Sequence, residues 1–186
     1  MNILLKELLD VPPLKIQIYC DMDGVLVDMD KGFEAISGGY TPKTFKDAPQ
    51  FNGNDQAARK EFWKLIGRTP NFWANLDPMG DATVLWKYLT ETFKDPAPVI
   101  LSAGQGRDIL AGKTSWIRKH ISPTAQVILA PGGVKKPNYI IPQEGVTHIL
   151  IDDTQKNLDV WDNGDNRLAI FHKNAAETIR LLGEIK

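Results

Sequence analysis

Residues 16–30, IQIYCDMDGVLVDMD, join an apolar run typical of a buried strand to a cluster of four aspartates. Residues i and i+2 of an extended chain point to the same side, and a turn at Gly24 would let Asp21 and Asp23 converge. An ionised carboxylate is costly to bury unless it is paired or binds a metal. The stretch therefore predicts a cation site or a chemical role for these carboxylates at the end of a strand.

Two other interpretations, a calcium-binding loop and a solvated turn, fit the aspartate cluster less well than a catalytic or Mg²⁺ site does. An EF-hand calcium loop needs its glycine at position 6, whereas here glycine comes fourth and the apolar residues 25–27 follow it. The apolar flanks also argue against a solvated turn. Hard cations such as Mg²⁺ prefer oxygen ligands, which the aspartates supply. Of the remaining two, Asp28 is expected to cap a helix and Asp30 to be solvated.

The rest of the chain alternates between strand-like and helix-like segments, which predicts a doubly wound α/β fold with a parallel five-stranded sheet. The second, third and fourth strand-like runs are continuously apolar, as is typical of strands that are buried on both faces. Strands are expected at 15–20, 98–102, 125–130, 147–152 and 167–171, and helices at 55–67, 80–94, 112–121, 154–163 and 173–185.

Two structural units are expected. No strand-like run occurs between residues 31 and 77, so this range is predicted to form a small, mostly helical cap inserted after the first strand. Residues 1–30 and 78–186 are predicted to form the α/β core domain. Ligands of such sheets bind at the carboxyl ends of the strands, where Asp21, Ser102 and Asp152 would lie.

Composition limits the classes of function. The chain has 186 residues, a net charge of −1 and one cysteine, Cys20. The absence of a basic stripe argues against nucleic acid as a partner, and no apolar run reaches membrane-spanning length. The N-terminus does not have the pattern of a signal peptide, so a cytoplasmic location is expected. The oligomeric state is open, and a homodimer is one possibility.

Four motifs resemble those of the haloacid dehalogenase (HAD) superfamily of phosphohydrolases. IYCDMDGVLVD matches the first motif, an apolar strand followed by D-x-D-G. VILSAG supplies Ser102 of the second motif, with the backbone N–H of Ala103 as a further phosphate-binding group. HILIDDT supplies the acidic pair of the fourth motif, with Asp152 as the expected metal ligand and Asp153 in an outer position.

The lysine of the third motif has three candidates. Lys136 is preferred because its short separation from Asp152 suits a loop beside the fourth strand, and it would neutralise the nucleophile and the phosphate. Lys135 is almost as good a candidate. Lys113 is expected to lie in the first turn of a helix, although it too could face the phosphate.

The resemblance implies a mechanism with a covalent intermediate. Asp21 would attack phosphorus to form an aspartyl-phosphate, and Asp23 would serve as general acid and then general base. Mg²⁺ would be held by Asp21, the backbone carbonyl of Asp23 and Asp152. The implied substrate is a small-molecule phosphomonoester.

Within the superfamily, the chain resembles the 5′(3′)-deoxyribonucleotidases. The matching segments are DGVLVD, NFWANLDPMGDA, KTSW, LIDD and NLDVWDNGDNRLAIFH. Met29, Phe72 and Trp73 are candidates for a nucleobase pocket because aromatic faces can stack on a base; equally, the aromatic residues could form the core of the cap. A sugar-phosphate phosphatase and, with less support, a nucleic-acid 3′-phosphatase are the alternatives.

The second motif departs from the nucleotidase pattern. It reads Ser-Ala-Gly where Thr-Ser-Pro is usual, and residues 37–55 have no counterpart. Preferences for base, sugar and the 5′ or 3′ position are therefore open. Three further tryptophans and the three histidines are expected to be structural: Trp86, Trp116, Trp161, His120, His148 and His172.

Overall fold

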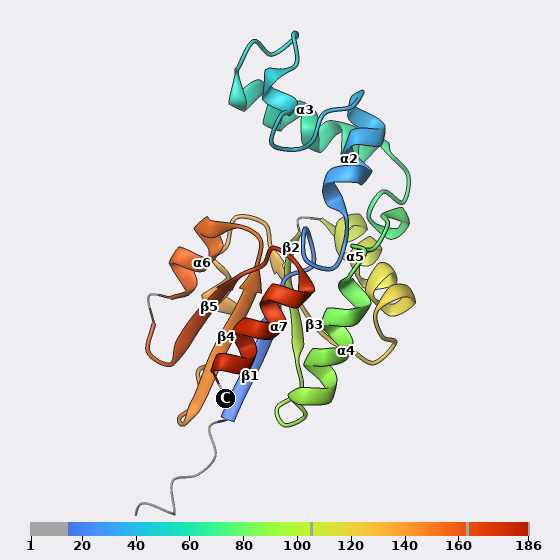
Figure 1. Cartoon of the computed structure of the whole chain (residues 1–186). Helices are drawn as coiled ribbons and strands as arrows, with labels where there is room; N and C mark the ends of the chain where they lie inside the picture. The colour runs from blue at the N-terminus through green and yellow to red at the C-terminus, as the bar shows by residue number, and fades with distance from the viewer. Residues whose placement is uncertain (1–14, 105, 163, 186) are drawn as a thin grey trace, which may run out of the picture.

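The computed structural model describes residues 15–104, 106–162 and 164–185. Its centre is a five-stranded, wholly parallel sheet with the order β3-β2-β1-β4-β5 (Figure 1). Helices flank this sheet, so the predicted doubly wound α/β class is confirmed. The strands are β1 (Lys15–Cys20), β2 (Val99–Gly104), β3 (Gln126–Pro131), β4 (Val146–Asp152) and β5 (Arg167–Phe171).

The first strand, β1, occupies the middle of the sheet between β2 and β4. Cys20 pairs with Ile100 on one side and with Ile151 on the other. All three residues are completely buried, as apolar side chains at the centre of a parallel sheet usually are. This register brings the carboxyl ends of β1, β2 and β4 to one edge of the sheet, which is where the candidate site lies.

Strand β3 differs from its prediction as a strand buried on both faces. It lies at the edge of the sheet and pairs only with β2. Among its residues only Ala130 is buried, while Gln126 and Pro131 are exposed. Continuous apolar character marks both central and edge strands of a sheet covered by helices, so the sequence pattern alone could not separate the two cases.

The helices match the predicted positions, except that one is longer and one had no predicted bounds. Helix α5 begins at Arg107, earlier than the predicted start at residue 112, and α2 follows Asp28, where a helix was expected without predicted bounds. Asp28 caps α2, as expected, because its side chain accepts a hydrogen bond from the backbone N–H of Lys31 at 2.9 Å. The helices are α2 (Met29–Ser37), α3 (Asp55–Arg68), α4 (Ala82–Thr92), α5 (Arg107–His120), α6 (Gln155–Trp161) and α7 (Ala175–Glu184).

Helices α2 and α3 form a lobe that projects beyond the strand ends (Figure 1). Short 3₁₀ helices η1 (Phe45–Asp47) and η2 (Trp73–Asn75) complete the chain between β1 and α4. Phe33 of α2 packs against Phe45 and Phe62, with ring centroids 5.0 and 4.5 Å apart. This aromatic core of the lobe is continuous with the hydrophobic core of the sheet domain. The division of the lobe from the sheet domain at residues 31 and 77 stays a prediction.

Two adjacent chain segments connect the lobe to the sheet domain. The N–H of Asp28 donates to the carbonyl of Asp77 and the N–H of Met79 donates to that of Leu26, both at 2.9 Å. These hydrogen bonds fix the exit and the return of the chain side by side. The base of the lobe is thus positioned directly beside the strand ends.

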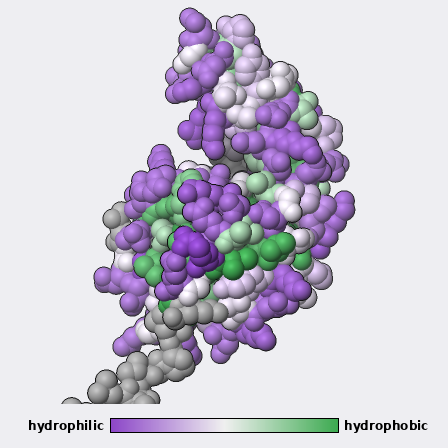
Figure 2. Space-filling model, in the orientation of Figure 1, coloured by the Kyte–Doolittle hydropathy of each residue, from purple (hydrophilic) through white to green (hydrophobic). Residues whose placement is uncertain are grey.

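The three tryptophans expected in the core are buried. Trp116 and Trp161 are fully buried and donate their indole N–H groups to the carbonyls of Leu76 and His148, and Trp86 is 7% exposed. Hydrophilic residues dominate the face shown in Figure 2, with a smaller hydrophobic patch where α4 and α7 lie. Among the described residues, no helix combines the length and apolar character that a bilayer crossing requires.

Candidate active site

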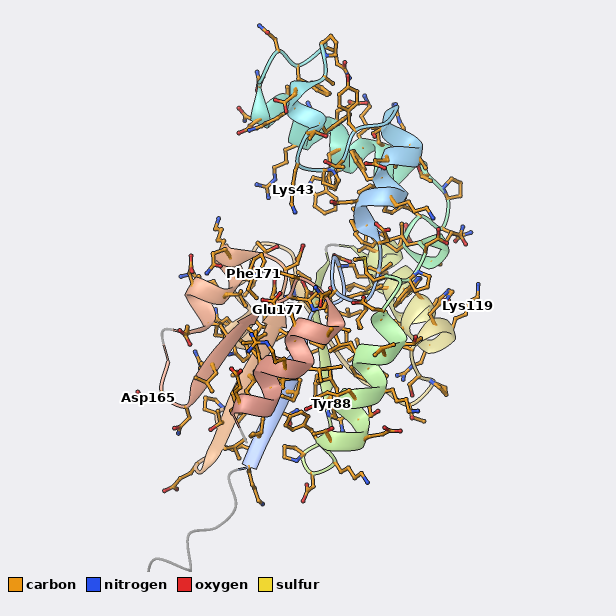
Figure 3. The ribbon with its side chains drawn as sticks, in the orientation of Figure 1. Lys43, Tyr88, Lys119, Asp165, Phe171 and Glu177 are labelled. Atoms are coloured by element: carbon orange, nitrogen blue, oxygen red, sulfur yellow. The ribbon has the colours of Figure 1, made fainter. Side chains whose placement is uncertain are left out.

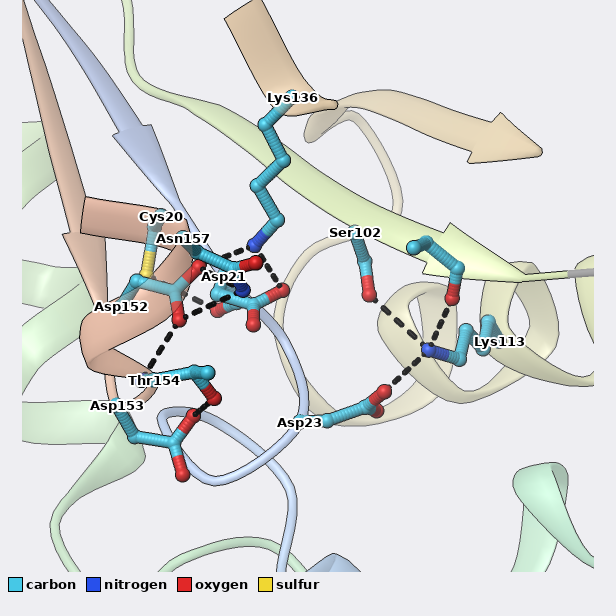
Figure 4. Close-up of polar contacts among 11 residues, drawn as sticks. Cys20, Asp21, Asp23, Ser102, Lys113, Lys136, Asp152, Asp153, Thr154 and Asn157 are labelled. Carbon is cyan, nitrogen blue, oxygen red and sulfur yellow. Dashed lines mark hydrogen bonds and ion pairs between the residues drawn. The ribbon is translucent and has the colours of Figure 1, made fainter. Parts of the chain in front are cut away.

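Asp21 and Asp152 lie at the carboxyl ends of the neighbouring strands β1 and β4. Asp21 is 7% exposed and Asp152 is fully buried. The Lys136 ammonium, on η3 (Lys136–Tyr139), lies between them, 2.9 Å from Asp21 Oδ1 and 2.5 Å from Asp152 Oδ2 (Figure 4). Lys135 is exposed. Of this adjacent pair of lysines, the structure therefore brings Lys136 to the acidic residues.

The charges around Lys136 explain its protonation. Burial alone would lower the pKa of the Lys136 ammonium, but the carboxylates of Asp21 and Asp152 outweigh burial and raise it. Lys136 therefore keeps its positive charge inside the site. A fixed ammonium at this position favours the binding of anionic groups, including the oxygens of a phosphate.

Asp152 is held by three further hydrogen bonds. The backbone N–H of Thr154 donates to Oδ1 at 2.8 Å, and the Asn157 amide donates to both oxygens at 3.1 and 3.0 Å. Burial and the charge of Asp21 raise the pKa of Asp152 to about 6, although Lys136 and Thr154 act against them. Asn157 was not predicted; its signal in the sequence is an amide in the first turn of the helix that follows the acidic pair.

A metal ion would fit between Asp21, Asp152 and Asp153. Carboxylate oxygens of these three residues lie within 4.8 Å of one another. Burial and, after it, the charge of Asp21 raise the pKa of Asp153. An all-oxygen donor set of this kind suits Mg²⁺. Asp153, expected in an outer position, thus lies as near to the group as the other two.

Gly24 makes room for this acidic group. Its φ of 76° lies in the left-handed region, which glycine adopts without strain. A Cβ atom at this position would overlap the Asp153 carboxylate. The glycine of the D-x-D-G motif is therefore needed twice, for the turn and for the close approach of Asp153.

The side chain of Asp23 points away from the three grouped carboxylates and toward Lys113 (Figure 4). The Lys113 ammonium, fully buried, lies 2.5 Å from Asp23 Oδ2, 3.0 Å from Ser102 Oγ and 2.7 Å from the carbonyl oxygen of Ala103. Burial raises the pKa of Asp23, and the charge of Lys113 opposes that shift. Only the backbone carbonyl of Asp23 was expected to bind metal, and its side-chain orientation is compatible with that expectation.

Lys113 occupies a different place from the one predicted. Helix α5 begins at Arg107, so Lys113 lies in its second turn rather than its first. Its face of the helix carries Trp116 and Ile117, both fully buried. A lysine three and four residues before two large apolar side chains is the signal that sequence reasoning missed, because such spacing places all three on one helix face.

Trp73 covers the Lys113 ammonium. The ammonium lies 4.3 Å from the centroid of the indole ring, which is a cation–π geometry. Trp73 is itself 5% exposed. The lobe thus contributes a side chain that shields the Lys113 ammonium from water.

A cavity of about 380 Å³ opens over Asp21 and Asp23. Of the three predicted pocket residues, Met29 lines this cavity, whereas Phe72 and Trp73 line a separate cavity of about 650 Å³. The three side chains therefore do not share one pocket. The walls of the smaller cavity are Asp21, Asp23, Gly24, Asp28, Met29, Asp30, Pro42, Lys43, Met79, Ala103, Lys136, Asp153, Thr154 and Asn157.

Solved structures share this fold across nearly the whole chain. A hydrolase from Streptococcus pneumoniae TIGR4 matches with a TM-score of 0.53 and 11% identity, over 90% of this chain and 97% of that one. A haloacid dehalogenase-like hydrolase from Burkholderia xenovorans LB400 matches with a TM-score of 0.53 and 15% identity, over 92% and 98%. A haloacid dehalogenase-like family hydrolase from Xanthomonas campestris matches with a TM-score of 0.53 and 12% identity, over 92% of both chains.

These structural matches show that the chain has the fold of HAD-like hydrolases. No protein-family model matches the sequence, and no curated protein matches it. The narrower resemblance to the 5′(3′)-deoxyribonucleotidases stays a prediction.

Proposed function

We propose that this protein is a Mg²⁺-dependent phosphomonoester hydrolase that works through a phosphorylated Asp21. The observation that carries the proposal is the pairing of two neighbouring aspartates with two different buried lysines, Asp21 with Lys136 and Asp23 with Lys113. A phosphate ester is an anion, so a site for it needs fixed cations beside its nucleophile. The HAD-like fold supports the same class of reaction.

Asp21 is the proposed nucleophile because its carboxylate lies at the strand end and lines the cavity. One of its oxygens would form a bond to phosphorus while the bond between phosphorus and the leaving oxygen breaks. Lys136, 2.9 Å from Asp21 Oδ1, would stabilise the phosphoryl oxygens as this exchange occurs. The product of this step is an aspartyl-phosphate and a free alcohol.

Asp23 is the proposed proton carrier. Burial raises the pKa of its carboxyl group, which favours the protonated form that can donate to the leaving oxygen. In the second step, Asp23 would take a proton from water, the water oxygen would bond to phosphorus, and the Asp21–phosphorus bond would break. Lys113 holds the Asp23 carboxyl group in place during both transfers.

The grouped carboxylates of Asp21, Asp152 and Asp153 are the proposed Mg²⁺ ligands, together with the backbone carbonyl of Asp23. When bound, Mg²⁺ would offset the repulsion between the anionic nucleophile and the anionic phosphate. Thr154 and Asn157 orient Asp152 toward this group. These hydrogen bonds keep the ligand arrangement fixed in advance.

For the substrate we propose (deoxy)nucleoside monophosphates, hydrolysed in the cytoplasm. The support is the sequence resemblance to the 5′(3′)-deoxyribonucleotidases and the presence of Met29 and Met79 in the cavity wall, where they could pack against a base. A small phosphorylated metabolite such as a sugar phosphate is the alternative. The position of Phe72 and Trp73 in the other cavity favours this alternative.

A phosphate-release assay with Mg²⁺ tests the proposal. Wild type would be compared on dUMP, dTMP, ribonucleotides and sugar phosphates, beside Asp21→Asn and the exposed control Asp47→Asn. We expect turnover by wild type and by Asp47→Asn and none by Asp21→Asn. Faster turnover of sugar phosphates than of every nucleotide would reject the nucleotide assignment alone, and full activity of Asp21→Asn would reject the mechanism.

A further inference from the structure

The wall of the catalytic cavity that the lobe supplies carries one lysine, Lys43. It lines the same 380 Å³ cavity as Asp21 and Lys136. Figure 3 shows Lys43 on the side of the lobe that faces the sheet domain. The cavity therefore has an ammonium group on the sheet side and another on the lobe side.

The backbone that carries Lys43 is firmly held. Thr41 and Thr44 exchange hydrogen bonds, because each backbone N–H donates to the other's hydroxyl oxygen, at 3.0 and 3.2 Å. The next residue, Phe45, is 2% exposed and packs in the aromatic core of the lobe. Pro42 further restricts the turn. The backbone of Lys43 is therefore held in place at the wall of the cavity.

Within the described ranges, the ammonium of Lys43 forms no ion pair with another residue. No described carboxylate lies within the 4.0 Å ion-pair distance of it, although Asp30 lines the same cavity. Lys43 therefore brings a positive charge, unpaired among the described residues, to the wall of the cavity that Asp21 and Lys136 also line.

We propose that Lys43 is a specificity-determining residue that binds a second anionic group on the part of the substrate that is not transferred. This inference rests on the proposed phosphomonoesterase function. Lys136 lies beside the nucleophile, where it would bind the phosphoryl group. Lys43 would then bind an acidic group at the far end of the substrate. Preferred substrates then carry a carboxylate or a second phosphate in addition to the scissile phosphate, so dUMP and dTMP, which lack such a group, would be weaker substrates than nucleotides that have one.

Substrates that differ in one charged group test this inference. One set is 3-phosphoglycerate, glycerol 3-phosphate and phosphoethanolamine, whose distal groups are anionic, neutral and cationic. Another is orotidine 5′-monophosphate and uridine 5′-monophosphate, which differ by one carboxylate on the base. The kcat/KM of each would be measured for wild type, Lys43→Met and a control, Lys46→Met. Lys46 lies in the same segment, 3.7 Å from Asp55, and does not line the cavity.

We expect wild type to prefer the anionic member of each set and Lys43→Met to lose about tenfold or more in kcat/KM on that member alone, as the loss of a charge-assisted hydrogen bond implies. Lys43→Arg would restore most of the preference, and Lys46→Met would retain it. An equal loss on all substrates would overturn the inference, since it would indicate a contact with the phosphoryl group or with Asp153. Unchanged selectivity would overturn it as well.

The same assay separates this inference from the proposed function. If wild type hydrolyses some of these esters but Lys43→Met keeps the wild-type ratios, only the role of Lys43 fails. If wild type hydrolyses no phosphomonoester with Mg²⁺ present, the proposed function fails and the role of Lys43 fails with it.

Discussion

Replacement of Lys113 with Met is expected to destabilise the fold by about 3 kcal/mol. Removing one partner of a buried ion pair costs about 3–5 kcal/mol because it leaves the other charge without compensation. Lys113 is fully buried, but the Asp23 side chain is 31% exposed, so water relieves part of the penalty and the lower end of the range applies. Methionine nearly fills the volume of the lysine stem, so no large cavity adds to this cost.

Urea unfolding at pH 7 with a chelator present would measure this change, since any bound metal would otherwise add stability. A loss of about 3 kcal/mol corresponds to a fall in Tm of roughly 6–12 °C for a domain of this size. The matched control is Lys119→Met, which replaces an exposed lysine on the same helix and is expected to change the unfolding free energy by less than about 0.5 kcal/mol.

A double-mutant cycle isolates the pair itself. Asp23→Asn alone leaves the Lys113 ammonium buried beside only neutral acceptors, Ser102 Oγ and the carbonyl of Ala103. The double variant removes both charges, so its cost is expected to fall short of the sum of the single costs by at least about 1 kcal/mol. Additive costs, or a Lys113→Met variant as stable as Lys119→Met, would refute the reasoning.

The pH dependence of Lys113→Met has a definite sign. Burial raises the pKa of Asp23, and Lys113 opposes this shift, so the substitution raises that pKa further. Between the unfolded and folded pKa values, the folded state holds a proton that the unfolded state has released, so the unfolding free energy falls as pH rises. The difference in unfolding free energy between wild type and Lys113→Met is therefore expected to be smaller near pH 4 than at pH 7.

Two further predictions concern the acidic group. Gly24→Ala is expected to cost about 1–2 kcal/mol of stability in backbone strain and to weaken Mg²⁺ binding, because the new Cβ displaces the Asp153 carboxylate. The control is Gly38→Ala, where φ is 82° and no atom lies near the new Cβ, so this variant should show only the cost of strain. Equal Mg²⁺ affinity in both variants, measured by isothermal titration calorimetry, would contradict this. Because the pKa of Asp152 is raised to about 6 and a ligand must lose its proton to bind, Mg²⁺ affinity is expected to fall as pH drops below about 6. An affinity that stays constant between pH 5 and 7 would count against Asp152 as a ligand.

Much of the fold followed from local patterns in the sequence. The apolar runs located all five strands because a parallel sheet buries its strands under helices on both faces. The strand ends then placed Asp21, Ser102 and Asp152 at one edge without further information. The extent of α2 after its expected cap, Asp28, could not be predicted because only Met29 and Phe33 are buried on it, and two apolar residues do not establish a helical period.

The pairing of side chains could not be predicted in the same way. Lys113 and Asp23 are 90 residues apart, and the contact depends on the rotation of α5 about its own axis, which packing against the lobe determines. Trp73 was expected in a substrate pocket with Met29, but the turn at η2 directs it onto Lys113 instead. Contacts between segments that are distant in sequence are set by tertiary packing, which no local pattern encodes.

The identity of the phosphorylated residue is the central claim, and chemical trapping tests it most directly. The enzyme would be mixed with excess substrate and Mg²⁺, quenched within one turnover and reduced with borohydride, which converts an aspartyl-phosphate to homoserine. Peptide mass spectrometry would then locate the change. We expect homoserine at position 21 in wild type and none in Asp21→Asn. Reduction at Asp23 or Asp152, or an enzyme that turns over with residue 21 unmodified, would contradict the account.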